Sequence, residues 1–493
     1  MKLLVENFGP IRKAEVELGP MTVFVGPSNA GKSYLAILIY SILSTAHDHT
    51  YGHLLGDRYF SDWIDTSASS KEKSLDAREF LFRRIEESFM AWAVRFSLVW
   101  MRRMEDCFLD AEMPLWMKMG KSVKIFSGNK KSEEKLVLDL SSPGKSNLPE
   151  SQKQAVFEKI LRFPEVLQLL GEDSVEDIAR QMKTGLMRGT FADRLTPILS
   201  SMLLGSVSGH PPMPAHYLPT ARSFLMQNLR SQIVLTLGSR RQDPGRNLHY
   251  PLFIVDFLKK LLYSNKGESY RGALYVGAFE GTEQQKMSIA RAGMFVESKI
   301  MRGKLEAVEM HGGYPEFDYV FGDESTRDRV PLLHASSMVA ELAALVVFIR
   351  EHIYPGDLLI FEEPEAGLHP AAQRDITNAL VQLANAGVHV LITTHSDTIL
   401  EQINNAVVAS EVEEKIAKQK LAEENLSTYL FKMPKDIKKG AAVKKIHFDD
   451  EVGILTKDHL DVSTALYNES VRLFNAGEKA RGKSGKKGKK NVD

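Results

Sequence analysis

The stretch that decides the fold reads Gly26-Pro27-Ser28-Asn29-Ala30-Gly31-Lys32-Ser33. It has the G-x-x-x-x-G-K-S spacing of a phosphate-binding loop, in which glycines let successive backbone N–H groups point at phosphate oxygens. Residues 21–25 precede it as an apolar strand and residues 34–43 follow it as an apolar helix. This context predicts a nucleotide site, with Lys32 at the β- and γ-phosphates and Ser33 on Mg²⁺. Because every fixed position is filled, we prefer this site to a ligand-free glycine turn.

The composition is that of a globular protein and indicates no partner by charge. The 493 residues predict roughly two to four domain-sized units. Lys plus Arg and Asp plus Glu each number 63, so the formal net charge is 0. The single cysteine, Cys107, excludes an internal disulfide and is typical of the reducing cytoplasm. No apolar run approaches the about 18 residues of a membrane span, and residues 1–6 reach an acid too early for a signal peptide. We therefore expect a cytoplasmic protein.

The first half of the chain combines short strands with long helical segments. Hydrophobic alternation predicts strands at residues 3–8, 14–18, 121–126 and 135–140. Apolar residues at helical spacing predict helices within 75–119 and 150–204. The aromatic side chains of the first segment fit a buried helix face better than stacking on nucleic-acid bases. Residues 46–214 are thus expected to form a mainly helical insertion with a small hairpin, ending at a Gly-, Ser- and Pro-rich boundary.

The second half returns to mixed strands and helices. A strand-like segment at residues 217–223 carries a basic side chain, Arg222, next to its end. Helices are predicted over 224–237, 251–263 and 282–301, and a hairpin over 304–310 and 316–321. Near the C-terminus we expect a charged helix at 411–426, short edge strands at 429–431 and 446–448, and an amphipathic helix at 461–476.

Two adjacent acids follow the next apolar strand. Residues 357–364 read Asp-Leu-Leu-Ile-Phe-Glu-Glu-Pro, the pattern of a Walker B segment. One acid at the end of such a strand can hold Mg²⁺, and its neighbour can orient and deprotonate a water. We assign Glu362 to the metal and Glu363 to the water. Acids after a strand are common on surfaces, but the phosphate loop upstream strengthens this assignment.

A histidine follows another predicted strand. Residues 370–386 form a predicted helix with proline in its first turn, and residues 388–393 form a buried strand that delivers His395 at its carboxyl end. Open α/β sheets place ligand-binding residues at that end. We predict that His395 hydrogen-bonds the γ-phosphate and senses its loss, in preference to a structural role. His369 is a weaker candidate, for a contact between subunits.

A pair of serines precedes the apolar helix that ends near residue 349. Ser336 or Ser337 can cap this helix, leaving free N–H groups aimed at an anion. An ordinary helix cap is one interpretation. The other is that this helix end meets the γ-phosphate bound by a second protomer.

The order of these motifs resembles the heads of ABC-type ATPases. More narrowly it resembles the OLD-like (overcoming lysogenisation defect) branch, in which Glu-Glu-Pro-Glu, Leu-His-Pro and Thr-His-Ser recur and Asn-Phe-Gly-Pro-Ile is found near the N-terminus. This sequence has those motifs at residues 362–365, 368–370, 394–396 and 7–11. Two positions depart from the pattern. Glu362 stands where aspartate is commoner, and Met338 stands where the branch usually has glycine after the paired serines.

The resemblance covers residues 1–45 and 215–405 and implies an α/β fold. This would be an ABC-type ATPase head, with a mixed sheet, a P-loop helix and an antiparallel β lobe, split by the large helical insertion at residues 46–214. A C-terminal α/β segment would follow at residues 406–478. A basic disordered tail would end the chain at residues 479–493.

The resemblance also implies partners. Two ATP molecules with Mg²⁺ would be sandwiched between two heads in a homodimer or higher homo-oligomer, and nucleic acid is a common partner of such proteins. Arg222 is similar to an arginine of these proteins, although a surface or ion-pairing arginine is an equal alternative. A metal-dependent Toprim nuclease is often attached, but the acids at residues 449–451 and 458–461 lack its spacing. We expect no nuclease centre in this chain.

The sequence therefore favours an ATP-hydrolysing switch or sensor. It would control a separately encoded effector, a nuclease or toxin, in anti-phage defence; that step is analogy, because fold does not fix function. The alternative is a DNA-repair or chromosome-associated ATPase that grips DNA directly. A transporter's ATP subunit is disfavoured by the long insertion. The Lys-rich tail is interpreted as a solvated end, with a salt-sensitive contact to phosphate backbone as the alternative.

Overall fold

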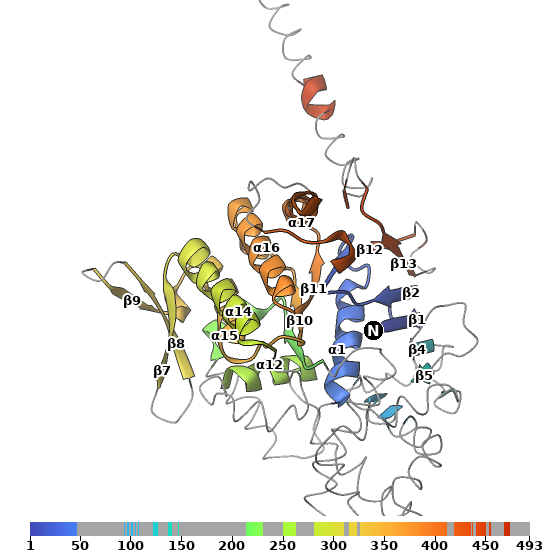
Figure 1. Cartoon of the computed structure of the whole chain (residues 1–493), viewed down its shortest axis with the longest axis horizontal. Coiled ribbons are helices and arrows are strands. Elements are labelled where there is room, and N and C mark those ends of the chain that lie inside the picture. The colour runs from blue at the N-terminus through green and yellow to red at the C-terminus, as the bar shows by residue number, and fades with distance from the viewer. Residues whose placement is uncertain are drawn as a thin grey trace, which may run out of the picture.

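The computed structural model places strands from the first 25 residues and from residues 426–446 in one sheet (Figure 1). It describes residues 1–46, 122–126, 137–140, 213–229, 250–262, 281–309, 315–322, 326–411, 419–434, 440–449, 453–454 and 468–473, with the single residues 93, 96, 97, 100, 101, 104, 107, 146 and 436. Most of the predicted insertion lies outside the described residues, including the helices expected over 150–204. The basic tail at 479–493 also lies outside them.

The described strands form a ten-stranded mixed sheet and a three-stranded antiparallel sheet. The large sheet has the order β5-β4-β1-β2-β13-β12-β3-β11-β10-β6. Its strands are β1 Lys2–Phe8, β2 Ile11–Glu17, β3 Met21–Val25, β4 Ser122–Phe126, β5 Val137–Asp139, β6 Ala215–Leu218, β10 Leu358–Glu362, β11 His389–Thr394, β12 Leu426–Lys432 and β13 Ala441–Ile446. Strands β12, β3, β11, β10 and β6 run parallel, and β5, β4, β1 and β2 pair antiparallel. The sheet is therefore mixed, with a parallel core.

The parallel strands are apolar on both faces, which is why they read as continuous hydrophobic runs. Along β10, Leu359 and Phe361 belong to one hydrophobic cluster, whereas Leu358 and Ile360 belong to another. Helix α1 (Lys32–Ala46) packs into the second cluster. The first cluster takes in α10 (Arg222–Gln227), α14 (Glu283–Phe295), α15 (Ser337–Glu351), α16 (Pro370–Asn385) and α17 (Asp397–Glu411). Helix α12 (Leu252–Leu262) contributes to both clusters.

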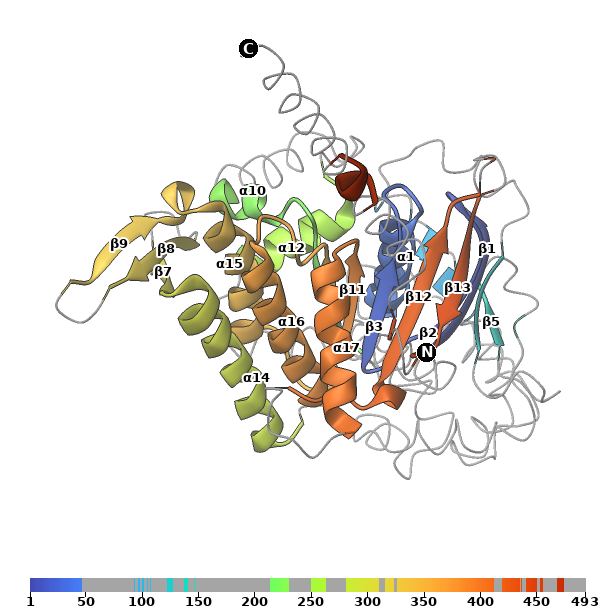
Figure 2. The same ribbon diagram turned by 90° about the horizontal axis from the view of Figure 1, so that it is seen from above.

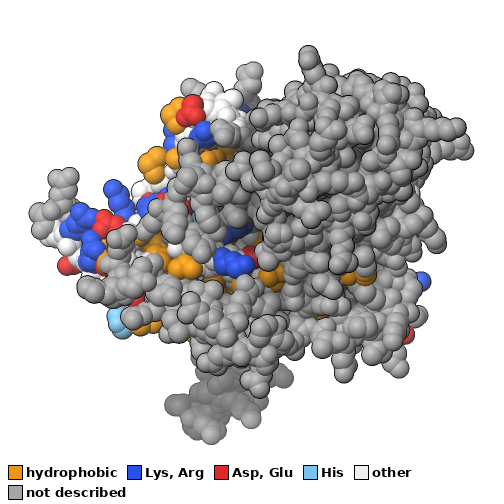
Figure 3. Space-filling view, turned by 90° about the horizontal axis from the view of Figure 1, so that it is seen from below, with side chains coloured by type: hydrophobic (Ala, Val, Ile, Leu, Met, Phe, Trp, Pro, Cys, Tyr) orange, Lys and Arg blue, Asp and Glu red, His pale blue; other side chains and the backbone are white. Residues whose placement is uncertain are grey.

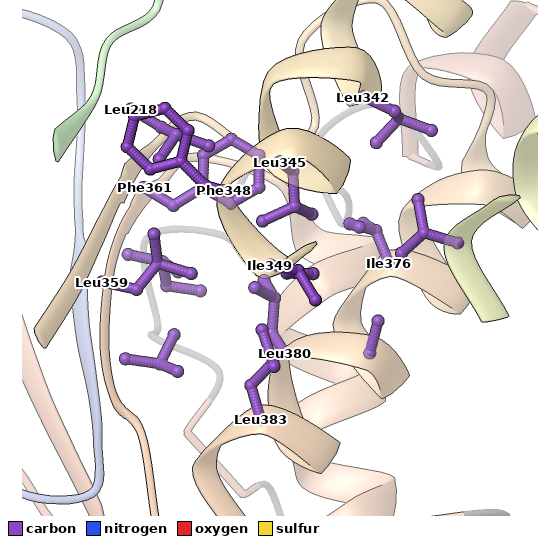
Figure 4. Packing of buried hydrophobic residues seen from close by; sticks show 14 of the residues in the cluster. Leu218, Leu342, Leu345, Phe348, Ile349, Leu359, Phe361, Ile376, Leu380 and Leu383 are labelled. Atoms are coloured by element: carbon purple, nitrogen blue, oxygen red, sulfur yellow. The ribbon is translucent and has the colours of Figure 1, made fainter. Parts of the chain in front are cut away.

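Helix α15 is the central element of the first cluster. Every residue from Val339 to Ile349 is buried. In Figure 4 the side chains of Phe348 and Ile349 lie between the strand residue Phe361 and the α16 residue Leu380. Helices α14, α15 and α16 form one layer beside the sheet (Figure 2). Burying such side chains stabilises by about 1.5–3 kcal/mol each, so the packing of α15 contributes strongly to the stability of this layer.

The three-stranded sheet forms a separate lobe. It consists of β7 (Lys304–Glu309), β8 (Pro315–Phe321) and β9 (Asp328–Pro331), and it confirms the hairpin predicted there. A π-helical turn, Val296–Met301, joins it to α14, and a 3₁₀ turn, Leu332–His334, leads from it to α15. Acidic and basic side chains mix at its surface, at the left of Figure 3. Arg329, for example, pairs with both Glu306 and Asp318.

Most expected elements are present near their predicted positions. The strands expected at 3–8, 21–25, 121–126 and 135–140 are β1, β3, β4 and β5, and the helices expected at 251–263 and 282–301 are α12 and α14 with its π-helical turn. Within 75–119, the described residues Ala93, Phe96 and Trp100 are helical and buried at helical spacing. Of the helix expected at 461–476, residues 468–473 are helical and exposed. The expected fold class is confirmed: an α/β mixed sheet with a P-loop helix and an antiparallel β lobe.

Two expectations near the C-terminus are wrong. The second expected strand, at 446–448, is instead β13 at Ala441–Ile446. Neither β12 nor β13 is an edge strand, since β12 lies between β3 and β13, and β13 lies between β12 and β2. Residues 427–431 of β12 are buried. The charged helix expected at 411–426 is absent from the described residues 419–426, where a 3₁₀ turn (Glu423–Asn425) leads into β12. The charge pattern favoured a helix, but the pairing of β12 with β3 starts at Leu426 and so takes the last residue of the expected helix into the sheet.

Among the described residues, no helix is long and apolar enough to cross a membrane.

Candidate active site

The predicted site residues meet where the parallel strands end. Strand β11 lies between β3 and β10, with Thr394 opposite Val25 and Thr393 opposite Glu362. The phosphate loop, the segment starting at His395, and Glu363 therefore leave adjacent strands at the same edge of the sheet, which we call the carboxyl edge. Neighbouring strands are about 4.8 Å apart, so these segments lie within reach of one nucleotide.

The phosphate loop depends on its two glycines. Gly26 has φ +141° and Gly31 has φ +95°, values that side chains rarely allow. A Cβ on Gly26 would lie 2.5 Å from the carbonyl oxygen of Phe431 on β12, and one on Gly31 would lie 2.9 Å from Ile11 Cγ1. The loop is thus pressed against β12 on one side and against the start of β2 on the other.

The side chains of the loop divide between the interior and the surface. The exposed ones are Pro27, Ser28, Asn29 and Ser33, whereas Ala30 is buried. Asn29 takes a left-handed φ of 63°. The exposed part of the loop is the part available to a phosphate chain, and Ser33 stands at its end in the first turn of α1.

Lys32 is buried and folds back over its own loop. Its Nζ donates hydrogen bonds to the carbonyl oxygens of Gly26 (2.7 Å) and Pro27 (2.9 Å). Burial lowers the pKa of Lys32, and the nearby carboxylates of Glu363, Glu365 and Glu362, in that order, act against this shift. The ammonium group is therefore held inside the loop, beside the acids that end β10.

The two adjacent acids have different environments. Glu362 is buried, and its Oε2 accepts a hydrogen bond from Thr220 Oγ1 (3.2 Å). Its Oε1 is buried without a hydrogen-bond partner among the described residues. The side chain of Glu363 is 33% exposed, and its backbone has a left-handed φ of 42°. Such strained non-glycine residues cluster at functional sites.

These donors fit Mg²⁺. Magnesium prefers oxygen ligands and is usually held by one or two carboxylates together with phosphate oxygens and water. Ser33 offers an exposed hydroxyl, and Glu362 offers a buried oxygen that lacks a partner. Within the described ranges there is no group of three or more His, Cys, Asp or Glu that could hold a metal ion.

Glu365 holds the histidine segment, a role that sequence reasoning missed. Its buried Oε1 accepts hydrogen bonds from Thr394 Oγ1 (2.8 Å) and from the backbone N–H of His395 (2.9 Å). The same oxygen lies 3.3 Å from His395 Nδ1, and Glu363 Oε1 lies 4.0 Å from that nitrogen. The only sequence signal was that Glu365 is the third acid of the Glu-Glu-Pro-Glu motif. His395 thus stands between the two glutamates, with its side chain 52% exposed.

Arg222 is buried behind the acids rather than exposed at the surface. It is 0% exposed, and its guanidinium lies 4.6 Å from the centre of the Phe361 ring. Nη1 donates to the carbonyl oxygen of Glu362 (2.7 Å) and Nη2 to that of Glu363 (3.0 Å). Nε lies 3.0 Å from Glu341 Oε2 on α15. Burial lowers the pKa of Arg222, and the Glu341 carboxylate is the strongest opposing influence.

The paired serines lie at the start of α15. Ser336 caps the helix by accepting a hydrogen bond from the backbone N–H of Val339 (3.4 Å), and both serines are exposed. Among the described residues, no hydrogen bond or ion pair joins either serine to the phosphate loop of the same chain. The side chain of Met338 is half-buried against the core. His369 caps α16 by accepting from the N–H of Ala371 (3.3 Å).

Residues 220–401 match the family described as "AAA domain, putative AbiEii toxin, Type IV TA system". This part of the chain is similar to AAA-type ATPase domains. It contains the acid pair, the histidine and the paired serines, and the phosphate loop lies upstream of it. ATPases of this type bind ATP together with Mg²⁺. Among curated proteins, no sequence matches the chain.

Solved structures with a similar chain path include heads of SMC proteins. A head bound to the C-winged helix domain of ScpA has 10% identity and a TM-score of 0.37, over 91% of this chain and 97% of that one. A head with an extended coiled coil, bound to the C-terminal domain of ScpA from Pyrococcus furiosus, has 11% identity and a TM-score of 0.34, over 95% and 98%. The SMC head domain from Thermotoga maritima has 10% identity and a TM-score of 0.32, over 90% and 98%.

Proposed function

We propose that this chain hydrolyses ATP at the carboxyl edge and uses the ATP cycle to switch a separately encoded effector. The observation that carries the enzymatic part is the convergence of Lys32, Glu362, Glu363 and His395 on one edge from adjacent parallel strands. The match of residues 220–401 to an AAA family supports the same activity.

Each residue at this edge has a distinct task. Lys32 and the loop N–H groups bind the phosphates, and Ser33 with Glu362 holds Mg²⁺, which neutralises charge on the phosphate oxygens. Glu363 accepts a proton from the attacking water. The side chain of Glu363 is partly exposed and can contact water, whereas the side chain of Glu362 is buried. His395, held by Glu365, hydrogen-bonds the γ-phosphate.

The site is completed by a second copy of the chain. Ser336 and Ser337 are exposed at the N-terminus of α15, where the helix dipole favours an anion. We propose that they contact the nucleotide of the partner, so that ATP closes a homodimer or a larger homo-oligomer and hydrolysis opens it. Met338 packs against the hydrophobic core of its own chain, so Ser336 and Ser337 are the exposed side chains at this end of α15.

The effector is proposed to be a nuclease or toxin in anti-phage defence. The motif order supports an OLD-like ATPase, and the description of the matched family, which names a putative toxin, is compatible with such a system. The alternative is a DNA-repair or chromosome-associated ATPase. The basic stretch at residues 479–490 favours it. It predicts hydrolysis that DNA stimulates without any partner protein.

The enzymatic proposal is tested with Glu363→Gln in the full chain. We expect kcat to fall at least about 100-fold while ATP binding is retained, because the amide cannot accept the proton of the water. Lys32→Ala should lose ATP binding. The matched control is Glu401→Gln, an exposed acid on α17, which should behave as the wild type. Hydrolysis by Glu363→Gln at the wild-type rate would refute the assignment.

The switch proposal is tested with the same variant in the native host. Tagged Glu363→Gln should trap the ATP-bound state, so proteins and nucleic acids that copurify with it can be identified. A stoichiometric second protein that is lost when Lys32→Ala is added supports an effector. DNA alone, released by salt, favours the alternative. Expression with the effector should also give toxicity or phage protection, and the defence role is wrong if it gives neither.

A further inference from the structure

Arg222 places a complete positive charge in the interior, which is costly unless the charge is paired and hydrogen-bonded. Three segments supply its partners. The turn after β6 offers the carbonyl oxygen of Pro219 (3.2 Å), and α15 offers the carbonyl oxygen (3.2 Å) and the carboxylate (3.0 Å) of Glu341. The end of β10 offers the carbonyl oxygens of Glu362 and Glu363.

The bond to Glu363 fixes the backbone of that residue from one side. On the other side, its N–H donates to the carbonyl oxygen of Thr393 on β11 (2.9 Å). Glu363 is the residue at which the chain turns out of β10 with a left-handed φ of 42°. This turn sets the direction of the Glu363 side chain. The hydrogen bonds from Arg222 and to Thr393 of β11 fix the turn, so they also fix the position of the carboxylate.

The bond to Glu341 connects the same guanidinium to the exposed end of α15. Glu341 follows Ser337 by about one helical turn. Its Oε1 accepts a hydrogen bond from Ser223 Oγ (2.6 Å), and a Cβ on Gly367 would lie 3.1 Å from its Cγ. A shift of the first turn of α15 therefore reaches Arg222 through packed side chains.

We propose that Arg222 is a positioning residue that couples the N-terminal end of α15 to the backbone of Glu363. Engagement of that helix end by the γ-phosphate of a partner's ATP then sets the geometry of the carboxylate that acts on the protomer's own nucleotide. This inference rests on the proposed function, since it takes Glu363 as the water-activating group. In this proposal Arg222 does not touch ATP and acts on hydrolysis through Glu363.

The test is Arg222→Lys in the full chain, with ATP affinity, kcat and association measured separately. One ammonium group cannot bond to Glu341 and to both carbonyl oxygens at once. We expect kcat to fall at least about 10-fold, because small errors in the position of a catalytic group are costly. The Kd for ATP should stay within about threefold of the wild type, since the phosphate loop is untouched. Association driven by a non-hydrolysable ATP analogue should also persist.

The matched control is Arg350→Lys. Arg350 also lies on α15 and also combines a carboxylate, Glu297, with a backbone carbonyl, that of Leu305, but it does so at the other end of the helix. It should leave kcat unchanged. A folded Arg222→Lys with the wild-type kcat overturns the inference, and so does a fall in kcat matched by an equal loss of ATP affinity.

A second variant decides the matter if Arg222→Lys does not fold. Glu341→Gln keeps the volume of the side chain and removes the charge that pairs with Arg222; kcat should again fall at unchanged Kd, and a wild-type kcat overturns the inference. The two proposals fail in different ways. If the wild-type chain does not hydrolyse ATP, the proposed function is wrong. If it does, and Glu363→Gln does not, a fully active Arg222→Lys refutes the positioning role alone.

Discussion

Gly26 connects the chemistry of the phosphate loop to the packing of the sheet. The residue must turn the chain with φ +141° while its Cα faces the carbonyl oxygen of Phe431. Only glycine meets both demands, since it has no Cβ and tolerates this region of conformational space. The loop backbone that would bind phosphate is thus shaped by a strand from the other end of the sequence.

Gly26→Ala should lower the free energy of unfolding by about 3 kcal/mol and abolish ATP binding. Backbone strain and the close approach of the new Cβ to Phe431 each cost about 1–3 kcal/mol. Urea unfolding monitored by circular dichroism measures the first effect, and calorimetric titration with ATP measures the second. Gly19→Ala is the control, because its Cβ would meet Ser427 Oγ at 3.2 Å without a positive φ. Equal stabilities of the two variants would contradict the account.

Strand β12 is the element that brings the C-terminal part of the chain into the sheet. It pairs parallel with β3 and antiparallel with β13, and it lies directly beside the strand that carries the phosphate loop. Tyr429, buried at its centre, accepts a hydrogen bond from the N–H of Glu17 (2.7 Å). The phenol thereby links β12 to β2.

Tyr429→Phe should cost about 1 kcal/mol at neutral pH, because the N–H of Glu17 loses its acceptor. Burial raises the pKa of Tyr429 from 10.0 to about 12. Between these values the unfolded chain has lost the phenol proton while the folded chain keeps it, so the stability contributed by Tyr429 falls as pH rises. The wild type should lose up to about 1.4 kcal/mol per pH unit more than the variant in this window. Urea midpoints from pH 9.5 to 11.5 measure the difference, and parallel curves would refute it.

The position of β12 in the sheet could not be predicted from the sequence. The strand itself was expected near residues 429–431, but its place in the interior depends on pairing with β3, about four hundred residues away. Helix α17 was not predicted at all, although Ser396 caps it by accepting from the N–H of Ile399 (3.3 Å). By contrast, β3, β10 and β11 were predicted correctly, because strands buried on both faces read as continuous apolar runs.

The candidate site divides in the same way. Lys32, Glu363 and His395 were predicted to belong to the site because each follows a strand in a recognisable motif, and the structure places the ends of those strands side by side. Arg222 and Glu365 were named only as parts of the resemblance, without a role. Their roles depend on which backbone groups and side chains the fold places beside them, and spacing in the sequence does not specify that.

The molecule as a whole presents its exposed phosphate-loop residues and its exposed serines on separate segments. Ser336 caps α15, so its substitution affects the helix as well as any ligand. Ser337 is exposed, and within the described part of the chain its side chain makes no hydrogen bond, which makes it the better probe of a contact with a partner's nucleotide. If each site is shared between two chains, two inactive variants can complement each other in a mixed dimer. If each site lies within one chain, they cannot.

Mixing two inactive variants should restore hydrolysis. Lys32→Ala removes the phosphate contact of its own chain, and Ser337→Glu places a negative charge where the partner's γ-phosphate would lie, so each variant alone has two defective sites. In a mixed dimer one site combines the intact loop of one chain with the intact serine of the other. Random pairing in a twofold dimer gives at most about a quarter of the wild-type rate in an equimolar mixture. Phosphate release measured before and after mixing tests this. If each site lies within a single chain, mixing restores nothing, because neither variant then contributes a complete site.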